Sequence, residues 1–153
     1  MLLRKLGVAV SFIWLGMVLA ISFMEAPLKF QAPNVTLEIG LGIGRLVFKA
    51  LNIIELIFLF ILILSIFEGK KFDRTLGRLY FGLFFVLVAQ SSWLLPILDA
   101  RAIMIISGQK VEPSYAHLTY VVLEICKVFL LIAFGVVSMK RLAESASDSS
   151  GLK

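Results

Sequence analysis

The fold class follows from one uncharged stretch of 20 residues, Leu79 to Leu98, which reads LYFGLFFVLVAQSSWLLPIL. As a helix it would be about 30 Å long, which matches the hydrocarbon thickness of a bilayer. The whole chain has the same character, because 60% of its 153 residues are hydrophobic and only 16% are charged. Soluble domains carry about a quarter charged residues. This composition excludes a soluble globular enzyme, a disordered chain and a disulfide scaffold, and it predicts an integral membrane protein.

Three more apolar segments surround this stretch, and together they predict transmembrane helices at about 6–24, 36–67, 78–98 and 115–139. The second helix is the hardest to delimit, because its purely apolar part, Leu56 to Phe67, is too short to span a bilayer. It must extend upstream to a start just after Pro33, which gives a helix of about 45 Å with a tilted, kinked or protruding outer end. The first segment could instead be a cleaved signal peptide, but its long apolar run favours a retained helix.

The distribution of basic residues predicts the orientation of the chain. The expected cytoplasmic side carries Arg4, Lys5, Lys70, Lys71, Arg74, Arg78, Lys140, Arg141 and Lys153. Because cytoplasmic connections are rich in lysine and arginine, we expect both termini inside. The prediction is an all-α membrane protein, a four-helix transmembrane bundle in one domain over 1–141, with outer connections at 25–33 and 99–113. A disordered tail is expected at 142–153, and the location is a cell membrane, most simply a bacterial inner membrane.

Polar side chains form one narrow stripe on each even-numbered helix. On the second helix they recur at steps of seven, four and three residues, at Glu38, Arg45, Lys49 and Asn52, with Glu55 on the flank. On the fourth helix they recur at steps of three, four and three, at His117, Tyr120, Glu124 and Lys127. Ionisable groups in a bilayer are costly unless they face the protein interior and find partners. The two stripes therefore predict a polar seam between the second and fourth helices.

Depth along the helices predicts which members of the seam meet. Glu55 and Lys127 both lie about 18 Å from the cytoplasmic ends of their helices, and Gln90 lies about 16 Å along the third. We therefore expect a central Glu55–Lys127 ion pair. Glu124 is expected to accept from Lys49 and to lie within hydrogen-bonding reach of Asn52.

The candidate binding residues of the seam are Arg45, Lys49, Asn52, Glu55, Gln90, His117, Tyr120, Glu124 and Lys127, with Asp99 and Arg101 at the outer mouth. One interpretation is that the seam binds or passes a small solute, a proton or an ion, with two glutamates as titratable gates. A second is a structural or assembly subunit whose buried ion pairs only fix helix packing. A third is a membrane redox protein that binds a quinone or haem.

Other signals are weak. One histidine and one cysteine cannot form a metal-ligand cluster, and no nucleophile–base set occurs, so neither a metal nor a cofactor is predicted and a non-enzymatic role is favoured. Nucleic acid is not an expected partner, because the basic residues fit membrane topology. The expected partner is the lipid bilayer. Gly40 and Gly44 form a small-xxx-small pair, which could admit a second copy or another membrane protein.

The order of several short stretches resembles a known family. They are Trp14-Leu15-Gly16, then Phe23-Met24-Glu25-Ala26-Pro27 with Phe30, then Gly44-Arg45-Leu46-Val47-Phe48, then Trp93-Leu94-Leu95-Pro96-Ile97-Leu98-Asp99-Ala100-Arg101, and His117. Over roughly residues 10 to 138 the chain resembles bacterial four-helix membrane proteins of unknown function, to which human transmembrane protein 205 also looks related. The resemblance implies a four-helix bundle. It implies no activity and no catalytic residue at any position.

Overall fold

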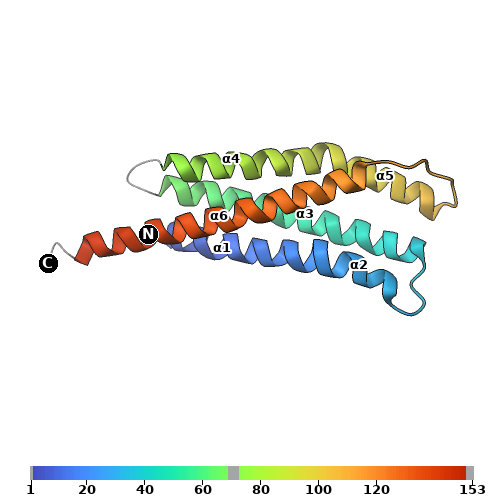
Figure 1. Cartoon of the computed structure of the whole chain (residues 1–153), viewed down its shortest axis with the longest axis horizontal. Coiled ribbons are helices and arrows are strands. Elements are labelled where there is room, and N and C mark those ends of the chain that lie inside the picture. Colours follow the sequence, from blue (N-terminus) through green and yellow to red (C-terminus); the bar gives the residue numbers. More distant parts are fainter. Residues whose placement is uncertain (1, 69–72, 151–153) are drawn as a thin grey trace.

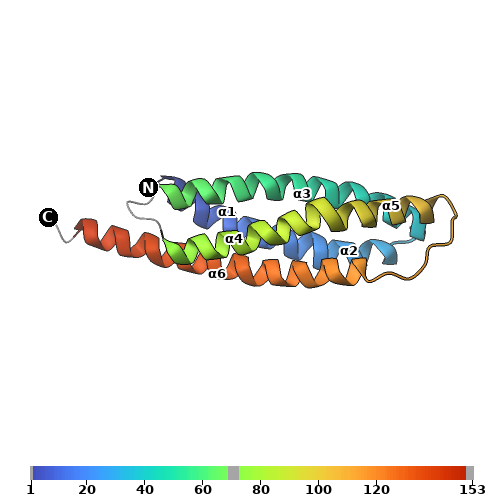
Figure 2. The same ribbon diagram turned by 90° about the horizontal axis from the view of Figure 1, so that it is seen from above.

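Four long helical runs lie side by side in an elongated bundle (Figures 1 and 2). The computed structural model describes residues 2–68 and 73–150, and these contain no strand. The four runs are Leu2–Gln31, Leu37–Phe67, Arg74–Ile106 and Ala116–Ser147, each long and apolar enough to cross a membrane. We call the end of the bundle that holds both termini the terminal end, and the end that holds the connections 32–36 and 107–115 the loop end (Figure 1).

The second run is one unbroken helix, α3 (Leu37–Phe67). Its start agrees with the predicted start after Pro33, because Thr36 caps it by accepting a hydrogen bond from the Ile39 N–H at 3.3 Å. Gly40 lies against the ring of Phe30, and Gly44 lies against the side chain of Lys29. The first run of the same chain therefore packs closely against α3 at these two glycines.

The first and third runs are interrupted by π-helices, each followed by a proline. The first run consists of α1 (Leu2–Val18), the π-helix η1 (Leu19–Glu25), α2 (Ala26–Leu28) and the 3-10 helix η2 (Lys29–Gln31). The third consists of α4 (Arg74–Ala89), the π-helix η3 (Gln90–Leu94) and α5 (Leu95–Ile106). A proline lacks an N–H and clashes with the carbonyl four residues before it, and the wider π turn accommodates both effects.

The predicted connections at 25–33 and 99–113 are therefore too long. Helical structure continues to Gln31 in the first run and to Ile106 in the third. Pro27 and Pro96 lie in the first turns of α2 and α5, where proline is tolerated. Pro27 is therefore part of a helix and not of the predicted loop.

The fourth run, α6 (Ala116–Ser150), extends well past the predicted helix end at 139. The expected disorder is wrong for residues 142–150, where alanine, leucine and glutamate favour a helix and Arg141 pairs with Glu144 at 3.1 Å. Residues 151–153, and the basic residues Lys70 and Lys71, lie outside the described residues. Both chain ends lie at the same end of the bundle, as an even number of spans requires (Figure 1).

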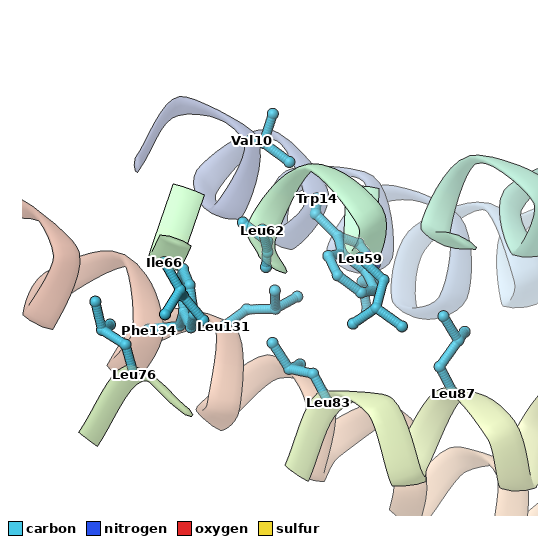
Figure 3. Close-up of a cluster of buried hydrophobic side chains, with 11 residues drawn as sticks. Val10, Trp14, Leu59, Leu62, Ile66, Leu76, Leu83, Leu87, Leu131 and Phe134 are labelled. Carbon is cyan, nitrogen blue, oxygen red and sulfur yellow. The ribbon is translucent and has the colours of Figure 1, made fainter. Parts of the chain in front are cut away.

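Apolar side chains fill the terminal half of the bundle (Figure 3). This apolar core comprises Val10, Trp14, Val18, Leu59, Leu62, Ile66, Leu76, Leu83, Leu87, Leu131 and Phe134. Small residues bring the helices together, since a Cβ added to Gly7 would lie 2.5 Å from the Ser65 Oγ. The outer surface is also apolar, with Phe60 62% exposed and Phe129 67% exposed. Such a surface suits contact with lipid rather than water.

Candidate functional site

Five polar or ionisable side chains meet in the middle of the bundle, and we call them the buried cluster. They are Trp14 of α1, Glu55 of α3, Gln90 of η3, and Glu124 and Lys127 of α6. Each of them is at most 1% exposed. The cluster therefore takes a side chain from every one of the four helical runs.

The ammonium group of Lys127 lies at the centre of the cluster. Its Nζ is 2.6 Å from the Glu55 Oε1 and 3.0 Å from the Glu124 Oε1. The predicted contact between Glu55 and Lys127 is thus confirmed, because equal depth on two parallel helices and an inward face bring the two groups together. Glu124 precedes Lys127 by three residues, so both point to the same side of α6.

Two neutral donors also bond the carboxyl groups. The Trp14 Nε1 donates to the Glu55 Oε1 at 2.9 Å, and the Gln90 Nε2 donates to the Glu124 Oε1 at 2.9 Å. Each glutamate therefore has one charged and one neutral donor. In a low-dielectric interior such hydrogen bonds offset part of the cost of removing the charges from water.

Two acceptor oxygens of the cluster remain without a donor. The Glu124 Oε2 and the Gln90 Oε1 are buried and have no hydrogen-bond partner. The Tyr120 hydroxyl, one turn away on α6, is the group of that helix best placed to approach Glu124. The cluster also holds two carboxyl groups but one ammonium group, so its ionised form carries a net charge of −1. The cluster thus holds two acceptors without a donor and, in its ionised form, one more negative charge than positive.

Polar contacts continue from the cluster toward the loop end, and we call this continuation the polar seam. The Asn52 Nδ2 donates to the Ser91 Oγ at 2.6 Å. Tyr120 is buried there, with its ring edge-on to Phe48 at 5.6 Å between ring centroids. At the loop end Arg45 binds both carboxylate oxygens of Asp99, at 2.6 and 3.1 Å.

A second buried cation lies at the loop end of the seam. The Lys29 side chain is only 9% exposed, and its Nζ is 3.2 Å from the Glu25 Oε2. The same Nζ lies 5.6 Å from the centre of the Phe30 ring and 5.5 Å from that of Phe48. Carboxylate and aromatic rings together can hold a partly desolvated ammonium group.

Several predicted members of the seam lie elsewhere. Lys49 is exposed and interacts electrostatically with Asp99, whereas the donors to Glu124 are Gln90 and Lys127. The expected Lys49–Glu124 contact is therefore wrong. Likewise Asn52 is bonded to Ser91 rather than to Glu124.

Two more predicted residues lie at the loop end. His117 is exposed at the start of α6, outside the buried cluster, and Arg101, predicted for the outer mouth, lies in α5 and donates to the backbone carbonyl of Glu112. The reason for His117 is its position: it lies in the first turn of α6, before Tyr120, the first buried residue of that helix.

Three residues with polar contacts in this region were not predicted: Trp14, Ser91 and Lys29. Trp14 could have been predicted, because an indole N–H far from a helix end needs an acceptor in a membrane. Ser91 could also have been predicted, because it directly follows Gln90 in the sequence. Lys29 could not be found, since its segment was predicted to be a loop.

Within residues 2–68 and 73–150, no group of three or more histidine, cysteine, aspartate or glutamate side chains could hold a metal ion. No protein-family model, curated protein or solved structure matches the chain. The resemblance to the bacterial four-helix family accordingly stays a prediction. The site is therefore interpreted from its own geometry.

Proposed function

We propose that this chain is a multi-pass protein of the cell membrane that binds a small polar solute or an ion in the polar seam. The proposed route enters at the loop end and stops at the buried cluster. With both termini cytoplasmic, as the basic residues predict, the entrance would face outward. The proposal rests on one observation, namely the different chemistry of the two halves of the bundle interior.

The loop-end half of the bundle carries partly buried hydrogen-bonding groups at successive depths. Asn52 lies one turn of α3 beyond Glu55, and Arg45 lies two further turns along the same helix, bound to Asp99. These groups could exchange hydrogen bonds with water or with a polar ligand.

The terminal half offers no comparable route among the described residues. The apolar core on the terminal side of the buried cluster includes four side chains that are 0% exposed. They are Leu62, Leu83, Leu131 and Phe134. Ser11 and Ser65 are buried there too, but each donates to a carbonyl of its own helix, at 2.8 and 2.7 Å. An apolar seal on one side of an ionised site favours binding over passage through the bundle.

A structural role is the second candidate, and one observation favours it. The cluster links all four helical runs through four hydrogen bonds, made by Trp14, Gln90 and Lys127. Such a network fixes the register of the helices even if nothing enters the seam. The two roles differ in one testable property, which is access of water to the seam.

Cysteine accessibility measures this property. Cys126 is the chain's single cysteine and is exposed, so Cys126→Ala gives a thiol-free background. In it, Ser91→Cys places a thiol in the seam, and Ser92→Cys places one at the same depth on an exposed surface position. Because only a hydrated thiol ionises and reacts, we expect a charged thiol reagent added to proteoliposomes to modify the first variant and spare the second.

A third variant tests the apolar seal. Ser65→Cys introduces the same thiol into the terminal half, where the serine is 7% exposed. It should resist the reagent in the folded protein and react after unfolding in SDS. Equal protection of Ser91→Cys and Ser65→Cys would contradict the binding proposal and leave the structural role.

A further inference from the structure

The geometry points to a proton-binding site in the buried cluster: Glu124 is a carboxylic acid whose proton, on Oε2, is donated to the Gln90 Oε1. This inference names a ligand for the seam and in that respect rests on the proposed function. It rests on two buried acceptor oxygens that lack a donor, the Glu124 Oε2 and the Gln90 Oε1.

The two unpartnered oxygens belong to groups that are already joined. The Gln90 Nε2 donates to the Glu124 Oε1 at 2.9 Å, and the atoms left over are the other oxygen of that carboxyl and the oxygen of that amide. A carboxylic acid and a primary amide pair through two antiparallel hydrogen bonds. One of the two is present, and a single proton on Oε2 supplies the other. Exchanging the oxygen and nitrogen of the Gln90 amide does not remove the need for a proton, because the amide oxygen would then lie beside the Glu124 Oε1.

The charge of the cluster requires the same proton. With both glutamates ionised, Lys127 leaves one negative charge unbalanced in an interior that excludes water. A proton on one glutamate makes the cluster neutral. The proton comes from water of the seam and returns to it, so no other reactant is needed.

The hydrogen bonds decide which glutamate holds the proton. The Glu55 Oε1 receives the shorter contact from Lys127, at 2.6 Å against 3.0 Å, and also the Trp14 indole. Glu55 is therefore the ionised partner of the lysine. What distinguishes Glu124 is the amide bonded to it, whose unpartnered oxygen can accept the proton.

The groups that face Glu124 leave few alternatives for a pH-dependent change. On its own helix these are Lys127 and Tyr120, and α3 contributes Glu55. The indole of Trp14 and the amide of Gln90 complete the surroundings, and neither titrates near neutral pH.

Infrared spectroscopy of the full-length protein in liposomes tests the proposal, because a protonated carboxyl has its own C=O stretching band. At pH 7 we expect one such band, lost in Glu124→Gln and retained in Glu38→Gln, whose glutamate is exposed. Gln90→Met should shift the band to higher frequency by removing its acceptor. Trp14→Phe should leave it unmoved, because the indole contacts only Glu55 within the cluster.

The outcomes separate this inference from the proposed function. A band that shifts in Trp14→Phe and not in Gln90→Met would place the proton on Glu55 and overturn the assignment. A missing band would overturn it as well, and a sodium-dependent change in its place would identify a metal cation as the ligand. If the band behaves as expected but does not respond to a short exposure to D₂O, the proton site stands and the open seam fails.

Discussion

Replacing Lys127 by methionine removes the single cation of the buried cluster while keeping a side chain of similar length. In the wild-type protein this ammonium group contacts two carboxyl groups at 2.6 and 3.0 Å, with no exposed surface on the lysine. Without it, an ionised glutamate would be buried with only neutral donors. The folded variant must therefore bind protons that the wild-type protein does not bind.

The magnitude follows from the number of glutamates that are ionised beforehand. An ordinary glutamate has a pKa of about 4.3, so protonating one at pH 7 costs about 3.7 kcal/mol, at about 1.4 kcal/mol per pH unit. With Glu124 already protonated, Lys127→Met adds one proton and lowers the free energy of unfolding by about 3.7 kcal/mol. If both glutamates were ionised in the wild-type protein, the loss would be about twice as large.

The assay is the free energy of unfolding in mixed micelles titrated with SDS, measured at pH 5, 6 and 7. The difference between wild type and Lys127→Met should shrink by about 1.4 kcal/mol for each pH unit of acidification. Lys140→Met is the control, because Lys140 is exposed on the same helix and its replacement should change stability by less than about 0.5 kcal/mol. The electrostatic argument would be refuted if the loss of unfolding free energy in Lys127→Met did not change with pH. It would also be refuted if Lys127→Met and Lys140→Met lost the same free energy.

Three further outcomes are expected. Glu124→Gln should keep the stability of the wild type within about 1 kcal/mol in the same titration, because a second amide can supply both hydrogen bonds to Gln90; a loss near that of Lys127→Met would contradict it. Gly7→Ala should destabilise by about 1–3 kcal/mol, since its Cβ would lie 2.6 Å from the Ser65 Cβ, whereas Gly16→Ala, with nothing within 4 Å, should stabilise. Partial burial raises the pKa of Asp73, but hydrogen bonds from the Leu76 and Thr75 N–H groups and from Arg141 hold it below its ordinary 3.8. Protection of the two amides from hydrogen exchange should therefore be constant above that pH and fall as the pH drops through the lowered pKa; an Asp73→Asn variant should lack this transition.

The sequence was sufficient for the four helices and for the central ion pair. Apolar length alone locates the spans, because the backbone in a membrane has few alternatives to the helix. The Glu55–Lys127 contact was predictable because both residues lie near the middle of a straight α-helix, where counting residues gives depth and angle with small error. The same counting should have excluded Lys49, which precedes Glu55 by six residues and therefore lies about 120° around α3 from it.

The remaining parts depended on structure that a residue count does not contain. The π-helices change the number of residues per turn, so positions beyond them no longer follow a 100° step. Gln90 lies at the start of one, and its amide direction could not be derived from spacing. The role of Trp14 was hidden for a different reason: one residue on an apolar helix gives no periodic signal, although its indole needs an acceptor.

The distribution of backbone irregularity supports the division of the bundle into two halves. The terminal half consists of regular α-helix, with close contacts at Gly7 and at Gly135, and it contains the apolar core. The π-helices Leu19–Glu25 and Gln90–Leu94 both begin at or beyond the level of the buried cluster and lead to prolines on the loop side. Such turns recur at functional sites because they redirect side chains and leave backbone groups able to rearrange. Both irregular turns lie in the polar half, where the proposed ligand-binding seam would use backbone groups that can rearrange.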